Sequence, residues 1–406
     1  MKHYDVVVIG LGIMGAAAAW RASLLGAKVI AMEKGGPTHR GGSSHGATRI
    51  FRQAYWEGQS YLRLLSLADK GWRELQSASE TQLIVPTGGL FIGRRSTGIV
   101  AGSLRTAVHG QIEHEHLTAA DIRERFPQFY VDDDMEAVYE PGAYAVLAEE
   151  ARLQMLNEAV ARGAELSYGE EVVSITSNAG WPSVTTRSGR SIGANSVLVC
   201  AGAANAMLLL ELASVLLPKR VAIYWFEPRL GRAEEFGPRA FPVFLYEAKD
   251  GALLYGIAAG MSAESGVKIG FHNRQHVTYA SSEEPAPDIK WYARVIENYV
   301  TEIFPDLVPS TVDGKWCIYT MTPDESFVVD RSANHPNVFY ASACSGHGFK
   351  FAPAIGQVLA EQSMGLRSSV DLAAFAFDRF GGRATVTAPS AKPALPQRLL
   401  ESKAGI

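Results

Sequence analysis

The sequence contains little cysteine: Cys200, Cys317 and Cys344 are three residues among 406. It has no Cys-x-x-Cys pair and no spacing typical of metal ligands, so we expect neither a disulfide framework nor a metal site. It lacks an uncharged apolar run of the roughly 18 residues that a membrane span needs. The N-terminus lacks the basic segment, apolar stretch and cleavage site of a signal peptide. We therefore expect a cytoplasmic protein with no membrane partner.

Net charge is also small, because 38 basic and 42 acidic residues give a formal value of -4. Nothing here resembles the clustered lysines and arginines of a nucleic-acid surface, so we expect no nucleic-acid partner. An anionic substrate would need a local group of basic side chains. The length predicts two domains, in a monomer or a small homo-oligomer.

The N-terminal segment has the pattern of a β-α-β unit. Val6–Ile9 is a continuous apolar run, as expected of a buried parallel strand. A helix of small residues is predicted over 16–25, and a second strand over 28–32 ends at Glu33. The glycine-rich segment between the first strand and the helix therefore stands where a dinucleotide-binding turn belongs.

That segment follows the pattern Gly-x-Gly-x-x-Gly. Gly10 permits the tight turn, Gly12 lets a pyrophosphate approach the backbone, and Gly15 lets helix and strand pack closely. The pyrophosphate would lie at the helix N-terminus, beside Ile13 and Met14. Glu33 is spaced to accept hydrogen bonds from the adenosine ribose. This pattern predicts a dinucleotide cofactor but does not separate FAD from NAD; the turn at Ala201 and Gly202 after an apolar strand mildly favours FAD.

Parallel-type strands at both ends of the chain flank β-rich insertions. We expect an α/β protein in which a Rossmann-type dinucleotide-binding domain carries an inserted, mostly antiparallel β-sheet domain for the substrate. The predicted boundaries are 1–85, 145–220 and 320–383 for the nucleotide domain, 86–144 and 221–319 for the substrate domain, and 384–406 for a flexible tail. Helices are predicted over 61–77, 119–126, 148–162, 291–303 and 352–363.

Two further segments carry chemistry. The loop 42–52 places one histidine and two arginines close behind the Glu33 strand, and Ser345–Phe351 reads Ser-Gly-His-Gly-Phe-Lys-Phe. A surface turn with solvated charges is one interpretation of the first segment. The alternative is that its guanidinium groups lie beside the cofactor, where they would hold a carboxylate or a reduced anionic flavin.

With these motifs the chain resembles the family of monomeric sarcosine oxidase, N-methyltryptophan oxidase and pipecolate oxidase over about 380 residues. The shared motifs are Gly-Ser-x-His-Gly-x-Thr-Arg-Ile-x-Arg at 42–52, Val-Lys-Ile-Gly-x-His at 267–272, Cys-x-Tyr-Thr-x-Thr-x-Asp-Glu at 317–325, and Ser-Gly-His-Gly-Phe-Lys-Phe at 345–351. The resemblance implies FAD as the cofactor, joined by a thioether from Cys317 to its 8α-methyl carbon. Cys200 and Cys344 are expected to be buried apolar residues.

The resemblance also implies roles for other residues. Arg52 and Lys350 match cations that bind the substrate carboxylate, and Lys268 matches a lysine credited with activating oxygen. Tyr255, His272 and Tyr319 match residues on the substrate side of the flavin, where Leu245 is also expected. The expected catalytic group is Tyr255, His272, Arg49 and His45, together with Lys268, which matches a residue on the opposite face of the flavin. Residues expected against the cofactor are Gly10, Gly12, Ile13, Met14, Gly15, Glu33, Ser43, Thr48, Arg49, Val172, Ala201, Gly202, Cys317, Gly346, His347, Gly348, Phe349 and Lys350.

The implied activity is oxidation of a secondary amine by FAD and O2, giving an imine and hydrogen peroxide. An N-methyl amino acid such as sarcosine would release formaldehyde. Ser44, where relatives commonly carry a second histidine, and the long stretch Ile257–Gly266 leave the substrate open. The alternatives are pipecolate, a proline analogue, N-methyltryptophan or a glycated amino acid. A flavin dehydrogenase with another electron acceptor is a further alternative.

Overall fold

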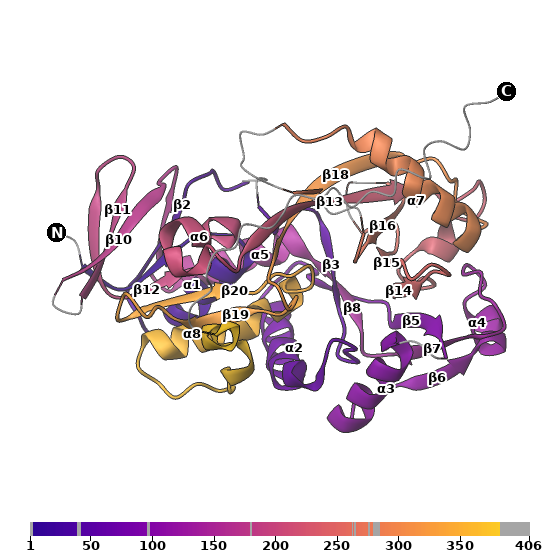
Figure 1. The fold of residues 1–406 in the computed structure, drawn as a ribbon, viewed down its shortest axis with the longest axis horizontal. Coiled ribbons are helices and arrows are strands. Elements are labelled where there is room, and N and C mark those ends of the chain that lie inside the picture. The colour runs from indigo at the N-terminus through magenta and orange to yellow at the C-terminus, as the bar shows by residue number, and fades with distance from the viewer. Residues whose placement is uncertain are drawn as a thin grey trace.

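The computed structural model describes residues 3–38, 42–95, 98–178, 181–261, 263, 265–274, 277–278 and 285–381. In these ranges the chain folds into two large sheets and one small sheet, with helices on their outer faces (Figure 1). The predicted tail at 384–406 lies outside the described residues. No helix of the described ranges is both long and apolar enough to cross a membrane.

The first sheet has the order β10-β11-β12-β1-β2-β9, with β20 added beside β12 and β19 beside β20. Its central pairs, β12-β1, β1-β2, β2-β9 and β12-β20, are parallel, as predicted. Its strands are β1 His3–Ile9, β2 Val29–Glu33, β9 Glu165–Tyr168, β10 Val172–Asn178, β11 Trp181–Thr186, β12 Ser191–Val199, β19 Val328–Arg331 and β20 Val338–Ser342. Because β1 and β2 are buried along nearly their whole length, both faces of the sheet are covered. Val6 and Val8 belong to one apolar cluster, and Val7 and Ile9 to another that includes Val184.

Helices α1 (Ile13–Leu24), α2 (Leu62–Ser77), α5 (Ala148–Ala161) and α8 (Ala352–Ser363) pack together on this sheet. Alanines along α1 are fully buried, and a Cβ on Gly356 of α8 would come within 2.5 Å of the α1 backbone at Ala17. Small residues therefore allow α1 and α8 to lie against each other. Short helices α6 (Asn205–Leu208), η2 (Gly202–Ala204) and η3 (Leu210–Leu212) follow β12, and η5 (Phe349–Phe351), η6 (Ala373–Phe375) and η7 (Phe377–Phe380) lie near α8 in sequence.

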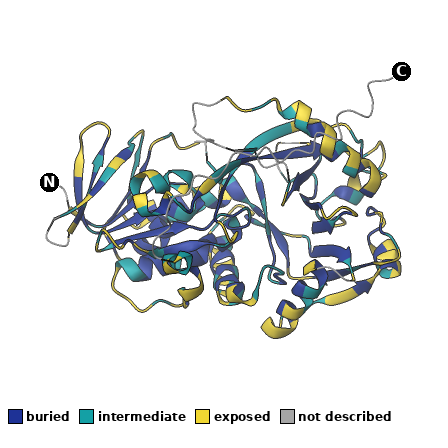
Figure 2. Cartoon of the chain, in the orientation of Figure 1, coloured by how far each residue is buried: buried dark blue, intermediate teal, exposed yellow. Residues whose placement is uncertain are grey.

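The second sheet has the order β17-β13-β16-β15-β14-β5-β7-β6, with β18 beside β13. All of its described pairs are antiparallel except β14 with β5. Its strands are β5 Gly89–Arg94, β6 Glu115–Thr118, β7 Met135–Glu140, β13 Leu217–Phe226, β14 Val243–Glu247, β15 Leu253–Ile257, β16 Val267–Phe271, β17 Val277–Thr278 and β18 Asp313–Met321. Four helices lie between these strands in the sequence: α3 (Gly98–Gly110), α4 (Ala119–Arg125), η4 (Ala233–Phe236) and α7 (Ile289–Ile303). Their exposed faces point outward (Figure 2).

A small antiparallel sheet, β3-β8-β4, joins the two large ones. It contains β3 Thr48–Phe51, β4 Ile84–Pro86 and β8 Tyr144–Leu147, and η1 (Gln59–Tyr61) leads into α2. The sequence predicted only a loop over 42–52, which was wrong for Thr48–Phe51, because this segment pairs with β8. No element was predicted over 98–110, where α3 buries Ile99, Val100 and Ala107 against the second sheet.

Candidate active site

A cavity of about 950 Å³ is lined by residues of all three sheets. This volume lies near the upper end of the range for protein ligand sites. The cavity lining includes every expected cofactor, substrate and catalytic residue except Gly15. Leu245 and His272 lie on the side of the second sheet, whereas Val172, Ala201 and Gly202 lie on the side of the first.

At one end of the cavity the Gly-x-Gly-x-x-Gly turn stands between β1 and α1. Gly10 has a φ of 90°, and a Cβ there would lie 2.6 Å from the Cys200 carbonyl oxygen. A Cβ on Gly15 would lie 1.8 Å from the Gly10 carbonyl oxygen, so Gly15 serves the packing of helix on strand and does not face the cavity. Both positions require glycine for the turn to form.

Glu33 closes this turn from the end of β2. Its Oε2 accepts from the Leu11 N–H at 2.9 Å and its Oε1 from the Gly35 N–H at 2.9 Å. Each carboxylate oxygen keeps a free lone pair direction, and the side chain lines the cavity. The carboxylate is thus fixed where ribose hydroxyls could donate to it.

The donor groups of the cavity fit a dinucleotide. Among the described residues, the buried hydroxyls of Thr320 and Ser342 have no hydrogen-bond partner, and both residues line the cavity. Buried polar atoms without partners are costly, so such groups indicate a ligand that supplies the missing bond. A Cβ on Gly12 would lie 3.1 Å from the Ser44 hydroxyl, which accepts from the Ile13 N–H at 2.9 Å, so glycine lets the loop 42–52 lie against the start of α1.

A cluster of positive charge lies where β3 meets the second sheet. The Arg49 guanidinium donates to the carbonyls of Ser43 at 2.9 Å, His45 at 2.6 Å and Thr48 at 2.8 Å, so the loop before β3 is wrapped around it. The ammonium of Lys268, on β16, donates to the same Thr48 carbonyl at 2.7 Å. Desolvation, reinforced by Arg49 and Lys268, lowers the pKa of His45 to about 4. At neutral pH His45 is therefore uncharged beside two fixed cations.

Cys317 faces this cluster from β18. Its thiol is buried, lines the cavity and lies 3.7 Å from the Ser43 carbonyl oxygen. Burial raises the pKa of the thiol, while Arg49 and Lys268 act in the opposite direction. A nucleophilic thiolate requires such positive neighbours. Cys200 and Cys344 also line the cavity; Cys200 is buried, as expected, but Cys344 is only partly buried and its sulfur accepts from the Thr320 N–H.

Tyr255 and Tyr319 form an aromatic wall next to Cys317. Their hydroxyls are hydrogen-bonded to each other, and burial raises the pKa of Tyr255 to about 12. Both phenols stay protonated at neutral pH. A Cβ on Gly346 would lie 2.6 Å from the Tyr319 ring, so the loop after β20 approaches this wall only because it has glycine there.

Two buried cations, Arg52 and Lys350, also line the cavity. The Arg52 guanidinium forms an ion pair with Glu57 at 2.6 Å and lies 4.4 Å from the centroid of the Tyr55 ring. The Lys350 ammonium donates to the His347 carbonyl at 2.7 Å and lies 5.1 Å from the same ring. Burial, with Arg52 adding to it, lowers the pKa of Lys350 to about 7. These groups together can receive an anion.

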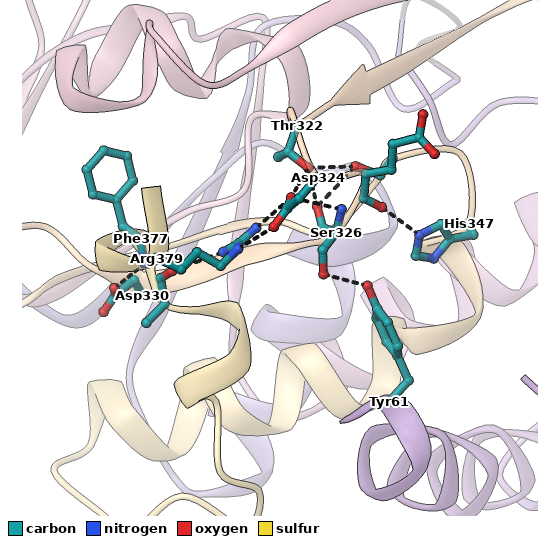
Figure 3. A network of polar contacts seen from close by, with 11 residues as sticks. Tyr61, Thr322, Asp324, Ser326, Asp330, His347, Phe377 and Arg379 are labelled. Carbon is teal, nitrogen blue, oxygen red and sulfur yellow. Dashed lines mark hydrogen bonds and ion pairs between the residues drawn. The ribbon is translucent and has the colours of Figure 1, made fainter. Parts of the chain in front are cut away.

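Hydrogen bonds behind the Lys350 loop hold His347 in one tautomer. Its Nε2 lies 3.1 Å from the Glu325 carbonyl, which can only accept, so Nδ1 is the unprotonated nitrogen and accepts from the Tyr55 hydroxyl at 2.5 Å. The turn that carries Glu325 is braced from the other side by Asp324, which pairs with Arg379 of η7 at 2.7 Å (Figure 3). The loop is thereby fixed to the C-terminal segment of the described chain.

Sequence reasoning missed two partners of Arg52, which are Tyr55 and Glu57, and the cavity hydroxyls of Thr320 and Ser342. Glu57 lies five positions after Arg52, but nothing in that spacing distinguishes a buried ion pair from a solvated one. The orphaned hydroxyls become visible only when their burial is known.

Comparison with known proteins defines the class. Residues 5–362 match the model of the FAD dependent oxidoreductase family, and the chain belongs to this family. It is 35% identical over 363 residues to monomeric sarcosine oxidase of Streptomyces avermitilis, covering 89% of this chain and 94% of that protein. It is 32% identical over 383 residues to N-methyl-L-tryptophan oxidase of Salmonella dublin, covering 93% and 99%.

A solved structure shares the fold. NikD, described as an unusual amino acid oxidase essential for nikkomycin biosynthesis, superposes in its open form with a TM-score of 0.79 at 23% identity, covering 93% of this chain and 98% of that one. The expected α/β fold, with a Rossmann-type FAD domain and a second sheet for the substrate, is confirmed. FAD as the cofactor and membership of the flavin-dependent amine oxidases are confirmed as well.

Proposed function

We propose that this protein oxidises a secondary amine that carries a carboxylate, an N-methyl amino acid such as sarcosine being the leading candidate. One observation carries the proposal: a single cavity joins the dinucleotide turn, the buried Cys317 thiol and the buried pair of cations Arg52 and Lys350. The names of the two relatives, a sarcosine oxidase and an N-methyltryptophan oxidase, support the same substrate class.

In this proposal the two cations bind the carboxylate. Arg52 offers a planar fork and Lys350 a point charge, and their shared contact with the Tyr55 ring brings them to one place. The amine end then extends toward Tyr255, His272 and Tyr319. Since both phenols remain protonated there, they present hydroxyl groups and ring faces but no negative charge, which favours a neutral amine.

Bound FAD supplies the two-electron oxidant for the C–H bond next to nitrogen. Cys317 is proposed as the attachment point, through Sγ to the 8α carbon of the flavin. Lys268 is proposed to favour reaction with oxygen, because its ammonium, held by the Thr48 carbonyl, is a preorganised positive charge for the negative charge that develops when oxygen is reduced. Residues 1–85, 145–220 and 320–383 would form the FAD domain, and 86–144 and 221–319 the substrate domain.

The test uses purified FAD-containing protein and a panel of sarcosine, N-methyltryptophan, pipecolate, proline and a glycated amino acid. Hydrogen peroxide should form with at least one carboxylated secondary amine, and not with the matching amine that lacks the carboxylate. Reduction of an artificial dye without peroxide would instead indicate a dehydrogenase. No turnover of any panel member by either readout would contradict the proposal.

A further inference from the structure

Glu140, the last residue of β7, is a carboxylate buried completely within the protein, with 0% of its surface exposed. Its two oxygens accept from the backbone N–H of Gln53 at 2.9 and 3.0 Å, and Oε2 also accepts from the N–H of Ala54 at 2.8 Å. Those two residues directly follow Arg52. A buried acid of the second sheet thus binds the backbone beside one of the two cavity cations.

The backbone at this point has few other ways to be satisfied. Strand β3 ends at Phe51, so the N–H groups of Gln53 and Ala54 lie beyond its ladder with β8. Buried N–H groups without acceptors destabilise a conformation by about 1–3 kcal/mol each. Glu140 supplies both acceptors, and the direction in which the chain leaves β3 depends on it.

The same short stretch receives the Arg52 side chain. Its Nη1 donates to the Ala54 carbonyl at 3.3 Å, while Nη2 pairs with Glu57. Any shift of residues 53 and 54 would therefore displace both the Cα of Arg52 and one support of its guanidinium. Glu140 is not among the residues that line the cavity, so its hydrogen bonds act on a ligand through this backbone.

We propose that Glu140 is the positioning residue for Arg52: it fixes residues 53 and 54 and so holds the guanidinium where a substrate carboxylate binds. This inference rests on the proposed role of Arg52 as a receptor for that carboxylate. It adds a residue from the second sheet, 88 positions later in the chain, to the substrate site.

A carboxylate is needed rather than an amide of the same shape. Ionised glutamate has two acceptor oxygens and no donor, whereas glutamine has one acceptor and an NH2 group that would face a backbone N–H. Burial raises the pKa of Glu140 to about 7, against the effect of the bound N–H groups and of Arg52, with Asp69 as a further raising charge. At pH 8 the carboxylate form therefore predominates.

The experiment measures dissociation constants of methoxyacetate and of its uncharged counterpart methoxyacetamide, from the flavin absorbance of the FAD-containing enzyme at pH 8. In Glu140→Gln the dissociation constant of methoxyacetate should rise about tenfold or more, while that of methoxyacetamide should change by less than about threefold. Glu136→Gln, on the same strand with its side chain toward Arg95 and His116, is the matched control and should change neither. In an Arg52→Met background, Glu140→Gln should add no further loss.

If the glutamine variant does not fold, Glu140→Asp replaces it. Aspartate keeps the charge but is shorter by one methylene, and the same changes in the two dissociation constants are expected. A change of less than about threefold for methoxyacetate, or equal weakening of both ligands, would overturn the inference while leaving the role of Arg52 intact. If the unmodified enzyme binds methoxyacetate no more tightly than methoxyacetamide, the proposed carboxylate receptor itself is wrong, and the inference falls with it.

Discussion

The two ends of the cavity are built by different means. The nucleotide end consists of glycines, backbone N–H groups and one carboxylate, Glu33, whose two oxygens accept from the backbone. The substrate end consists of buried charges, among them Arg52, Glu57 and Lys350, whose side chains pair with one another or with carbonyls. Burial shifts pKa values strongly at the second end. Shape therefore dominates the first end, and electrostatics dominates the second, where chemistry is expected.

The largest expected effect is at Cys317, whose thiol lines the same cavity. In Cys317→Ser the covalent bond to flavin should be lost completely, because serine has no sulfur nucleophile. Acid precipitation should leave the flavin in the pellet of the unmodified protein and in the supernatant of the variant. Flavin that stays in the pellet of the Cys317→Ser variant would show that another residue carries it, and Cys344→Ser is the matched control.

Removing the charge of Lys268 separates the two half-reactions. Lys268→Met should slow reoxidation by oxygen by about 10²–10³-fold, since one preorganised electrostatic group is lost. Anaerobic reduction by the amine should change only a few-fold. Stopped-flow absorbance of the flavin measures both rates, with the exposed Lys70→Met as control. Equal slowing of both steps would contradict the assignment.

Lys350 makes the substrate end sensitive to pH. Because its folded pKa is lowered to about 7, the ammonium is present below pH 7 and is lost as the pH rises above it. Affinity for methoxyacetate should fall between pH 6 and 8, by up to about tenfold per unit. Loss of the Glu140 proton, whose pKa is also about 7, acts in the opposite direction, because the carboxylate form holds Arg52 in place.

Lys350→Arg should weaken this pH dependence, because arginine stays charged throughout the range. Lys350→Ala should raise the dissociation constant at pH 6 by about tenfold or more, through loss of a charge-assisted contact. Titration of flavin absorbance at each pH is the measurement. An unchanged pH profile in the arginine variant would mean that Lys350 does not contact the carboxylate.

The smallest effect is expected at Thr320, whose hydroxyl is buried without a partner. In Thr320→Val the shape is kept and one hydrogen bond to the bound cofactor is lost, worth about 0.5–1.5 kcal/mol. The variant should show a flavin absorbance maximum or midpoint potential shifted slightly from that of the unmodified protein. Identical values for both would mean that the hydroxyl does not face the cofactor.

The comparison also explains how much of the molecule could be predicted from sequence. The nucleotide end is formed by residues close together in sequence, so the pattern of Gly10, Gly12 and Glu33 predicts it within one β-α-β unit. The helix α8 also begins and ends at the predicted residues. The residues that hold Arg52 in place are not all close to it in sequence. Glu140 comes from another sheet, and its role follows from burial and register, which no local pattern contains.

The strand β3 and the helix α3 were missed for a related physical reason. In Thr48–Phe51 the two apolar residues are adjacent and stand between arginines, so polar and apolar residues hardly alternate as they do in a typical strand. The segment becomes a strand because it pairs with β8, which is a tertiary contact. In α3 the glycines at both ends and at Gly102 lower helix propensity, but Gly102 allows the helix to pack closely on Trp56. Tertiary packing therefore determines the secondary structure of both segments.

Anaerobic mixing of the purified flavoprotein with sarcosine and its panel relatives tests the central claim most directly. The visible flavin absorbance should bleach with a carboxylated secondary amine, and admission of oxygen should restore it with one equivalent of hydrogen peroxide. A flavin that stays oxidised with every member of the panel, in protein that is folded and fully loaded with FAD, would contradict the account.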